Sequence, residues 1–237
     1  MSGLLGLLAV GLFTPAWAGV FTVTPVRIHM SPKDRAIAVT ITNEGDDELV
    51  MQADLYLWKQ KPSGQDDLTL TEDMFLSPPI IKLAPKSRQV VRLARLSTAQ
   101  PTEQLTYRMI VREIPEAKPA KADLQLQIAL AFSMPVFITP PGAKAKLACT
   151  VERVSAETIK ALCENSGTGY THPTALQLAS TAGDKIAIQE TGGYILPGIK
   201  RTFEITRTGG AIAGGKAKLI ATLDDGSSQT FDVNVSD

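Results

Sequence analysis

Three observations predict that this chain is an all-β protein. Turn-forming segments rich in Gly, Pro, Asn and Asp recur roughly every 8 to 14 residues, with strand-like runs between them. No stretch before residue 150 places its apolar residues at the 3.6-residue period of a helix. A segment with two prolines and a glycine, 139–146, separates the runs into two groups. We therefore predict two β-sandwiches of the immunoglobulin type.

The first group contains about seven strands in roughly 120 residues, as expected of one such sandwich. Its strand-like runs are residues 19–30, 36–60, 68–71, 75–96, 104–116 and 124–138. The second group reads as a smaller sandwich, with runs at 146–154, 158–167, 174–180, 185–190, 193–206 and 216–235. The predicted domains are therefore 19–140 and 141–237.

The first 18 residues have the features of a cleavable export signal. An apolar run from Leu4 to Phe13 is followed by Pro15 and by Ala16-Trp17-Ala18, a small-x-small cleavage site. The run is too short to span a bilayer, and it lacks the usual preceding Lys or Arg. We predict cleavage after Ala18 and export; the alternative is a buried first strand.

Charge and cysteine content narrow the possible functions. The 24 basic and 24 acidic residues give a formal net charge of +0, which disfavours nucleic-acid binding. The two cysteines, Cys149 and Cys163, are predicted to form a disulfide between neighbouring strands, because an exported protein is oxidised. They make a poor zinc site, since no further Cys or His supplies the other ligands.

No catalytic constellation is evident. The only histidines, His29 and His172, read as surface or loop residues without a nucleophile in a consistent setting. Residues 210–217, "GAIAGGKA", match G-x-x-x-x-G-K, but Ala217 stands where a phosphate-binding loop needs Ser or Thr. We read this segment as a hairpin loop, and we expect no enzyme activity, cofactor, metal or small-molecule substrate.

The run from 124 to 138 has an apolar face that is unusually long. Every even position is large and apolar, from Leu124 to Ile138, whereas most odd positions are Gln, Ala, Ser or Pro. The run would extend roughly 50 Å, far beyond an ordinary strand of about 5–6 residues. Either this strand bends between two sheets of its own sandwich, with Pro135 at the bend, or its outer part serves another protein.

Four segments resemble the PapD-like periplasmic chaperones of the chaperone–usher pathway, which assemble surface pili. They are "TPVRI" (24–28), "SPPIIKLAPKSRQVVRL" (77–93), "YRMIVREIP" (107–115) and "LQIAL…PVFITP" (126–140). The second half matches only through "YILPG" (194–198). "FSMPVF" and "YRMIVREIP" are more similar to the archaic, or sigma-type, branch. The resemblance implies an L-shaped pair of immunoglobulin-like domains with a cleft between them.

The resemblance also implies how the long strand acts. A pilin subunit lacks the last strand of its sandwich, and the chaperone's strand fills the open groove, which is donor-strand complementation. The donor strand is residues 124–132, with side chains Leu124, Leu126, Ile128, Leu130 and Phe132. Pro79 matches a family proline that controls docking to the outer-membrane usher. The free protein would have to cover this strand, for example by self-association.

The family holds the terminal carboxylate of the pilin with an Arg on the first strand and a Lys on the long strand. Arg27 matches the first of these, and its planar guanidinium suits a bidentate bond to a carboxylate. Pro135 stands at the lysine position and carries no charge. The resemblance therefore leaves Arg92 or Arg108 as the substitute cation.

Two other functions compete with a periplasmic pilus chaperone. A pilin or adhesin subunit would need a free donor extension and a single incomplete domain, whereas residues 19–30 read as an ordinary first strand. An exported immunoglobulin-like enzyme or sugar-binding module is disfavoured by the low aromatic content of 5% and by the missing catalytic set.

Overall fold

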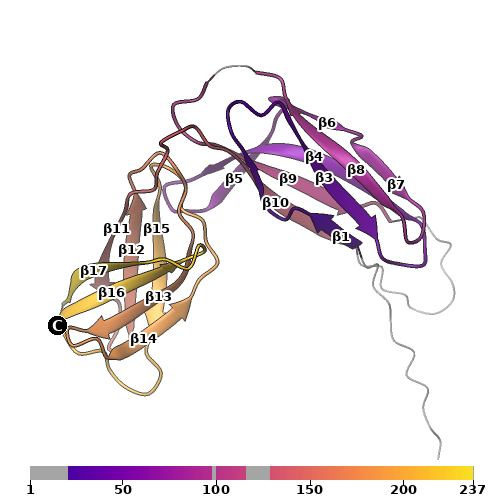
Figure 1. Ribbon diagram of the computed structural model, residues 1–237. Coiled ribbons are helices and arrows are strands. Elements are labelled where there is room, and N and C mark those ends of the chain that lie inside the picture. Colours follow the sequence, from indigo (N-terminus) through magenta and orange to yellow (C-terminus); the bar gives the residue numbers. More distant parts are fainter. Residues whose placement is uncertain (1–20, 98–99, 116–128, 237) are drawn as a thin grey trace, which may run out of the picture.

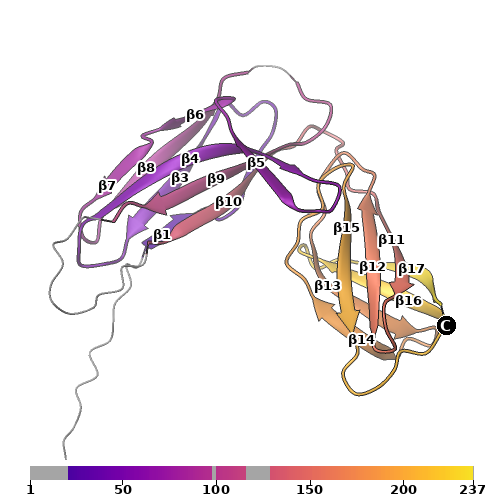
Figure 2. The same cartoon turned by 180° about the vertical axis from the view of Figure 1, so that it is seen from behind.

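The computed structural model describes residues 21–97, 100–115 and 129–236. They form two β-sandwiches in an L-shaped arrangement (Figure 1). In the view from behind, β5 of the first sandwich extends toward the second one (Figure 2). None of these residues lies in a helix, which confirms the predicted all-β class. The described part of the chain accordingly has no helix long and apolar enough to cross a membrane.

The first sandwich consists of two antiparallel-rich sheets. The smaller sheet has the strand order β1 (Phe21–Thr24), β3 (Ala36–Asn43), β8 (Arg88–Arg95), β6 (Met74–Ser77). The larger sheet has the order β2 (Ile28–Met30), β10 (Ala131–Ile138), β9 (Leu105–Glu113), β4 (Leu49–Gln60), β5 (Asp66–Leu70), and β7 (Ile80–Leu83) also pairs with β4.

This sandwich has ten described strands, rather than the predicted number of about seven. Two of the strand-like runs divide at prolines, which lack the N–H group that continues a ladder. Residues 19–30 divide after Thr24, so that β1 joins one sheet and β2 the other. Residues 75–96 divide at Pro78 and Pro79, and β6 and β7 likewise join opposite sheets.

The core of the first sandwich follows from the alternation of side chains along its strands. In β4, the side chains of Met51, Ala53 and Leu55 are buried between the sheets, whereas Asp54 and Tyr56 face outward. Successive side chains of a strand point to opposite faces, so this alternation places one apolar face inside. The outward face of β4 and β9 therefore remains available to form one wall of the angle between the sandwiches.

The second sandwich has a three-stranded and a four-stranded sheet. The first has the order β11 (Leu147–Arg153), β12 (Thr158–Asn165), β15 (Lys200–Thr206), and the second has the order β14 (Lys185–Glu190), β13 (Pro173–Ser180), β16 (Gly215–Leu223), β17 (Ser228–Val235). Residues 210–217 lead into β16 and not into a helix, which agrees with the hairpin-loop interpretation.

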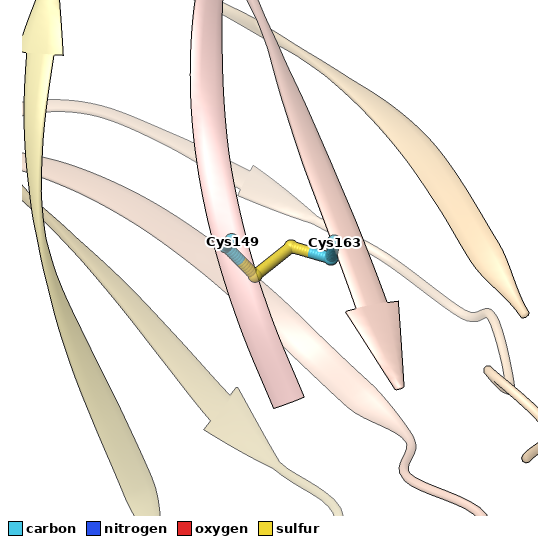
Figure 3. The surroundings of a disulfide bond; sticks show 2 residues. All are labelled: Cys149 and Cys163. Atoms are coloured by element: carbon cyan, nitrogen blue, oxygen red, sulfur yellow. A yellow bond between two sulfur atoms is a disulfide. The ribbon is translucent and has the colours of Figure 1, made fainter. Parts of the chain in front are cut away.

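A disulfide joins Cys149 of β11 to Cys163 of β12 (Figure 3). The two residues are direct partners in the register of these neighbouring strands. Cys163 is fully buried among the apolar side chains of the second core. The predicted disulfide is therefore confirmed, and it fastens one edge of the three-stranded sheet.

Candidate functional site

The outer half of β10 has a free edge. On one side, all of β10 pairs with β9. On the other side, β2 pairs in parallel with Val136, Phe137 and Ile138 only. Among the described residues, no strand pairs with Ala131–Pro135 on this second side. The main-chain groups along this edge are thus available to another strand.

Two large apolar side chains at or just before the start of β10 are exposed. Met134, Val136 and Ile138 point into the core and are buried. Phe132 belongs to the same face of the strand, and Leu130 precedes it by two residues, yet they are 39% and 38% exposed. The apolar face therefore continues past the region that its own sandwich covers. Leu124, Leu126 and Ile128, predicted to continue it, lie outside the described residues.

Arg27 lies between β1 and β2 and links the two sandwiches. Its guanidinium forms an ion pair with Asp224, which follows β16 of the second sandwich. It also donates to the hydroxyl oxygen of Tyr170 at 3.4 Å. Burial opposes the charge of Arg27, but Tyr170, Tyr194 and Asp224 outweigh it and raise the pKa of Arg27. Arg27 is therefore a permanent cation at the inner corner, by which we mean the region around Arg27 and Tyr194 where the two sandwiches meet.

Arg108 is the direct cross-strand partner of Pro135. Its guanidinium carbon lies 3.8 Å from the ring centroid of Trp58, and one of its nitrogens lies 3.5 Å from an oxygen of Asp66. Burial lowers the pKa of Arg108, and this effect is opposed by Asp66 and Tyr194. A guanidinium remains protonated in proteins, so a cation stands beside the uncharged Pro135.

Tyr194 lies near both of these arginines. The guanidinium carbons of Arg27 and Arg108 lie 5.6 and 5.5 Å from the centroid of its ring. Around it, an aromatic cluster fills the contact between the sandwiches: the ring centroids of Phe137 and Tyr170 are 4.1 Å apart, and those of His172 and Tyr194 are 4.0 Å apart. Sequence analysis missed this cluster, although "YILPG" contains Tyr194.

Two glutamines of the first sandwich bind main-chain groups of the second. The side-chain amide of Gln60 donates to the carbonyl of Tyr194 and accepts from the N–H of Leu196, both at 3.0 Å. The side-chain oxygen of Gln104 accepts from the N–H of Tyr170 at 2.8 Å. These bonds fasten the first sandwich to two connecting segments of the second one, β12–β13 and β14–β15. Nothing in the sequence pattern indicated them.

The two histidines lie in different settings. His29 is an exposed residue of β2, as predicted. His172 is a loop residue, but its side chain is only 14% exposed and stacks on Tyr194, so it is not a surface histidine. Within the described ranges, no group of three His, Cys, Asp or Glu side chains is placed to hold a metal ion.

A comparison with protein families identifies the chain. Residues 20–144 match the PapD amino-terminal domain, described as that of a pili and flagellar-assembly chaperone. The chain belongs to this chaperone family. Comparison with curated protein sequences finds no match.

Solved structures of pilus chaperones share the fold of both sandwiches. The complex of CsuC with the tip subunit CsuE, from archaic Csu pili of Acinetobacter baumannii, aligns with a TM-score of 0.66 at 18% identity, covering 92% of this chain and 100% of that chain. The YadV chaperone aligns with a TM-score of 0.62 at 17% identity, covering 90% and 98%. The chaperone DraB of E. coli aligns with a TM-score of 0.59 at 17% identity, covering 92% of this chain and 97% of the DraB chain.

Two residues suggested by the family resemblance lie away from the inner corner. Arg92 of β8 is exposed in the smaller sheet, where its register partners are Ala38 and Ser77. The structure thus places Arg27 and Arg108 near the same Tyr194 ring, whereas Arg92 lies in the smaller sheet. Pro79, between β6 and β7, is exposed, and its carbonyl accepts from the N–H of Ala53 at 2.8 Å.

Proposed function

We propose that this chain is a periplasmic chaperone that holds pilin subunits by donor-strand complementation and delivers them to an outer-membrane usher. It is no enzyme and needs no cofactor, because the exchange of one strand for another releases binding energy by itself. Residues 1–18 are the export signal, residues 19–140 the domain that binds the subunit, and residues 141–237 the second domain. The similarity to CsuC supports a place in the archaic branch.

The observation that carries this proposal is the coincidence of a free edge with an exposed apolar face on β10. An added strand would pair its main chain with Ala131–Pro135 and cover Leu130 and Phe132. Fully burying a side chain of this size contributes about 1.5–3 kcal/mol. With Leu124, Leu126 and Ile128, the gross contribution is on the order of 10 kcal/mol.

The cations at the inner corner support the same proposal. The free edge of β10 ends where β2 begins to pair, at Val136. A strand added along this edge must end there, next to Arg27, which directly precedes β2. We assign the subunit's terminal carboxylate to Arg27, with Arg108 as the second cation. Arg92, in the other sheet, is the weaker candidate.

Two further roles rest on exposure. Pro79 lies on the surface at the point where the chain crosses between sheets, and we propose that it takes part in usher docking. The free protein would protect its exposed strand by self-association, because an unpaired apolar edge invites pairing with another chain.

Co-expression with a candidate pilin tests the proposal. Wild-type protein should form a stable 1:1 complex, and Phe132→Asp and Ile128→Asp should abolish it by placing a charge in the pilin groove. Ser133→Asp is the matched control, because Ser133 is an exposed neighbour on the opposite face of β10. Donor-strand complementation is contradicted if the complex survives Phe132→Asp. It is also contradicted if no pilin forms a complex with the wild-type protein. If the chain were itself a pilin or adhesin subunit, it would instead need a free donor extension and a single incomplete domain.

A further inference from the structure

A pocket of about 580 Å³ opens into one end of the first sandwich. On the side of the larger sheet, it is lined by inward-facing side chains of three neighbouring strands: Leu57 of β4, Leu105 of β9 and Ile138 of β10. Leu105 and Ile138 are direct register partners. Ile138 is the last residue of β10, so the pocket lies at the opposite end of this strand from Phe132 and the free edge.

The pocket exists because the smaller sheet ends before the larger one. Met74, the first residue of β6, and Arg95, the last residue of β8, are direct register partners and line the pocket from the smaller sheet. Leu57 and Leu105 lie past this pair. They point between the sheets, yet they are only half-buried. The core therefore leaves apolar surface uncovered at this end.

The size and the lining of the pocket are those of a site for a small organic molecule. Such sites typically have volumes of about 300–1,000 Å³ and are mostly apolar, with a few polar groups that orient the ligand. Leu96 adds a further apolar wall and is 64% exposed. The polar lining residues are Glu72, Asp73, Arg95, Ser97 and Tyr107.

Asp73 presents a carboxylate oxygen that the protein itself does not use. The main chain of Asp73 is fixed, because its N–H donates to Oγ1 of Thr71 at 3.2 Å and its carbonyl accepts from the N–H of Leu96 at 3.3 Å. One carboxylate oxygen accepts from the hydroxyl of Tyr107 at 3.3 Å, and the other accepts no hydrogen bond from any described residue. Burial and the charge of Asp73 raise the pKa of Tyr107 to about 12, so this hydroxyl keeps its proton.

The charges around the pocket favour a cation. Neither Glu72 nor Asp73 forms an ion pair with a described residue. The guanidinium of Arg95 is buried and donates to the carbonyl of Pro32 at 2.6 Å, and not to either carboxylate. Two carboxylates and one guanidinium leave the lining with one negative charge. A monocation would neutralise it.

We propose that this pocket binds a small molecule with an apolar body and one ammonium group. The body packs on Leu57, Leu96 and Leu105, and the ammonium donates to the unused oxygen of Asp73. An ammonium suits this single acceptor because it is a compact charge with three donors. The proposal goes beyond the chaperone function, and the pocket shares no residue with the strand or the cations assigned to the pilin.

The methyl group of Met74 provides the measurement. In NMR spectra of the full chain with carbon-13 in the methionine methyl groups, Met74→Leu identifies its signal among those of the six methionines. Titration with 4-phenylbutylamine should shift this signal to saturation. 4-Phenylbutanol, which has the same body without the charge, should bind about tenfold more weakly, and 4-phenylbutyrate more weakly still. Equal affinities for the amine and the butyrate would overturn the proposal.

Asp73→Asn separates recognition of the charge from recognition of the shape. Asp73 is an exposed residue, and the amide oxygen can still accept from Tyr107, so the fold should be kept. The affinity for the amine should fall about tenfold, to that of the alcohol, while the affinity for the alcohol stays unchanged. Glu103→Gln is the matched control, because this exposed carboxylate precedes β9 but does not line the pocket. The site is rejected if Asp73→Asn binds the amine as tightly as the wild type does.

Leu105→Trp tests the apolar part of the site by filling the pocket. The folded variant should lose the amine and the alcohol alike, and retention of both contradicts the proposal. If the variant does not fold, Asp73→Asn decides the test. Phe132→Asp should bind the amine normally although it captures no pilin. The pocket and the chaperone function can therefore be rejected independently of each other.

Discussion

Arg27 and Asp224, 197 positions apart in the chain, form an ion pair that joins the two sandwiches. Their side chains are 32% and 16% exposed, so water screens the pair only in part. A carboxylate of the protein's own second domain therefore already contacts the arginine that we assign to the subunit's carboxylate. Asp224 must share Arg27 with the subunit or release it.

Asp224→Asn is expected to weaken the contact between the sandwiches and to free Arg27. The free energy of unfolding should fall by about 1 kcal/mol, as for a partly exposed pair, which urea denaturation measures. Pilin capture should be retained or strengthened. Asp225→Asn is the control, since that carboxylate accepts from Ser227 instead. If Asp224→Asn and Asp225→Asn lose the same free energy of unfolding, the ion pair between Arg27 and Asp224 contributes nothing specific.

Stability should decrease on mild acidification because of His172. Burial is the largest cause that lowers its pKa below the ordinary 6.5; Asp224 acts in the opposite direction, and Arg27 and Arg201 reinforce the decrease. As the pH falls through 6.5, the unfolded chain gains the proton before the folded chain does, so the free energy of unfolding falls.

The difference in Tm between pH 7.5 and pH 5.5 measures this effect, and it should shrink in His172→Gln. His29 is exposed as a residue, but its ring stacks on Phe137, and this partial burial together with the charge of Arg27 lowers its pKa. It should account for part of the remainder in the double variant. If the Tm depends on pH in the same way in the wild type and in the variant that lacks both His172 and His29, other groups cause the pH dependence.

Loss of the disulfide should destabilise the second sandwich. Replacing Cys149 and Cys163 by Ala removes a crosslink between residues 14 apart, for which the expected cost is about 3 kcal/mol. Urea denaturation of the variant and of reduced wild type should give similar decreases. Unchanged stability in both would mean that the pairing of β11 with β12 does not depend on the crosslink.

Gly193→Ala should displace the side chain of Arg201. The new methyl group would occupy the position of the Arg201 guanidinium, so Arg201 must move. Its hydrogen bond to the carbonyl of Tyr194 is then lost, and the free energy of unfolding in urea should fall by about 1 kcal/mol. Gly192→Ala is the matched control, because a Cβ there has open space around it. If both variants are equally stable, Arg201 is not held in the way that the structure indicates.

Residues near one another in the sequence made some features predictable. The alternation along residues 124–138 correctly predicted that Met134, Val136 and Ile138 share a buried face. The same alternation placed Phe132 on that face, but its exposure depends on where the opposite sheet ends. The strand count was too low, because prolines that looked like interruptions of one strand transfer the chain between two sheets.

What the sequence by itself determined is local: the all-β class, the strand faces, the disulfide between adjacent strands and the family. Period-two alternation and the spacing of two cysteines need no knowledge of distant segments. Only the tertiary structure decided which cations meet. Arg27 joins Asp224, Arg108 stacks on Trp58 near Arg201, and Arg92 lies in the other sheet. These contacts depend on the angle between the sandwiches, which the Gln60 and Gln104 hydrogen bonds and a few aromatic rings hold in place.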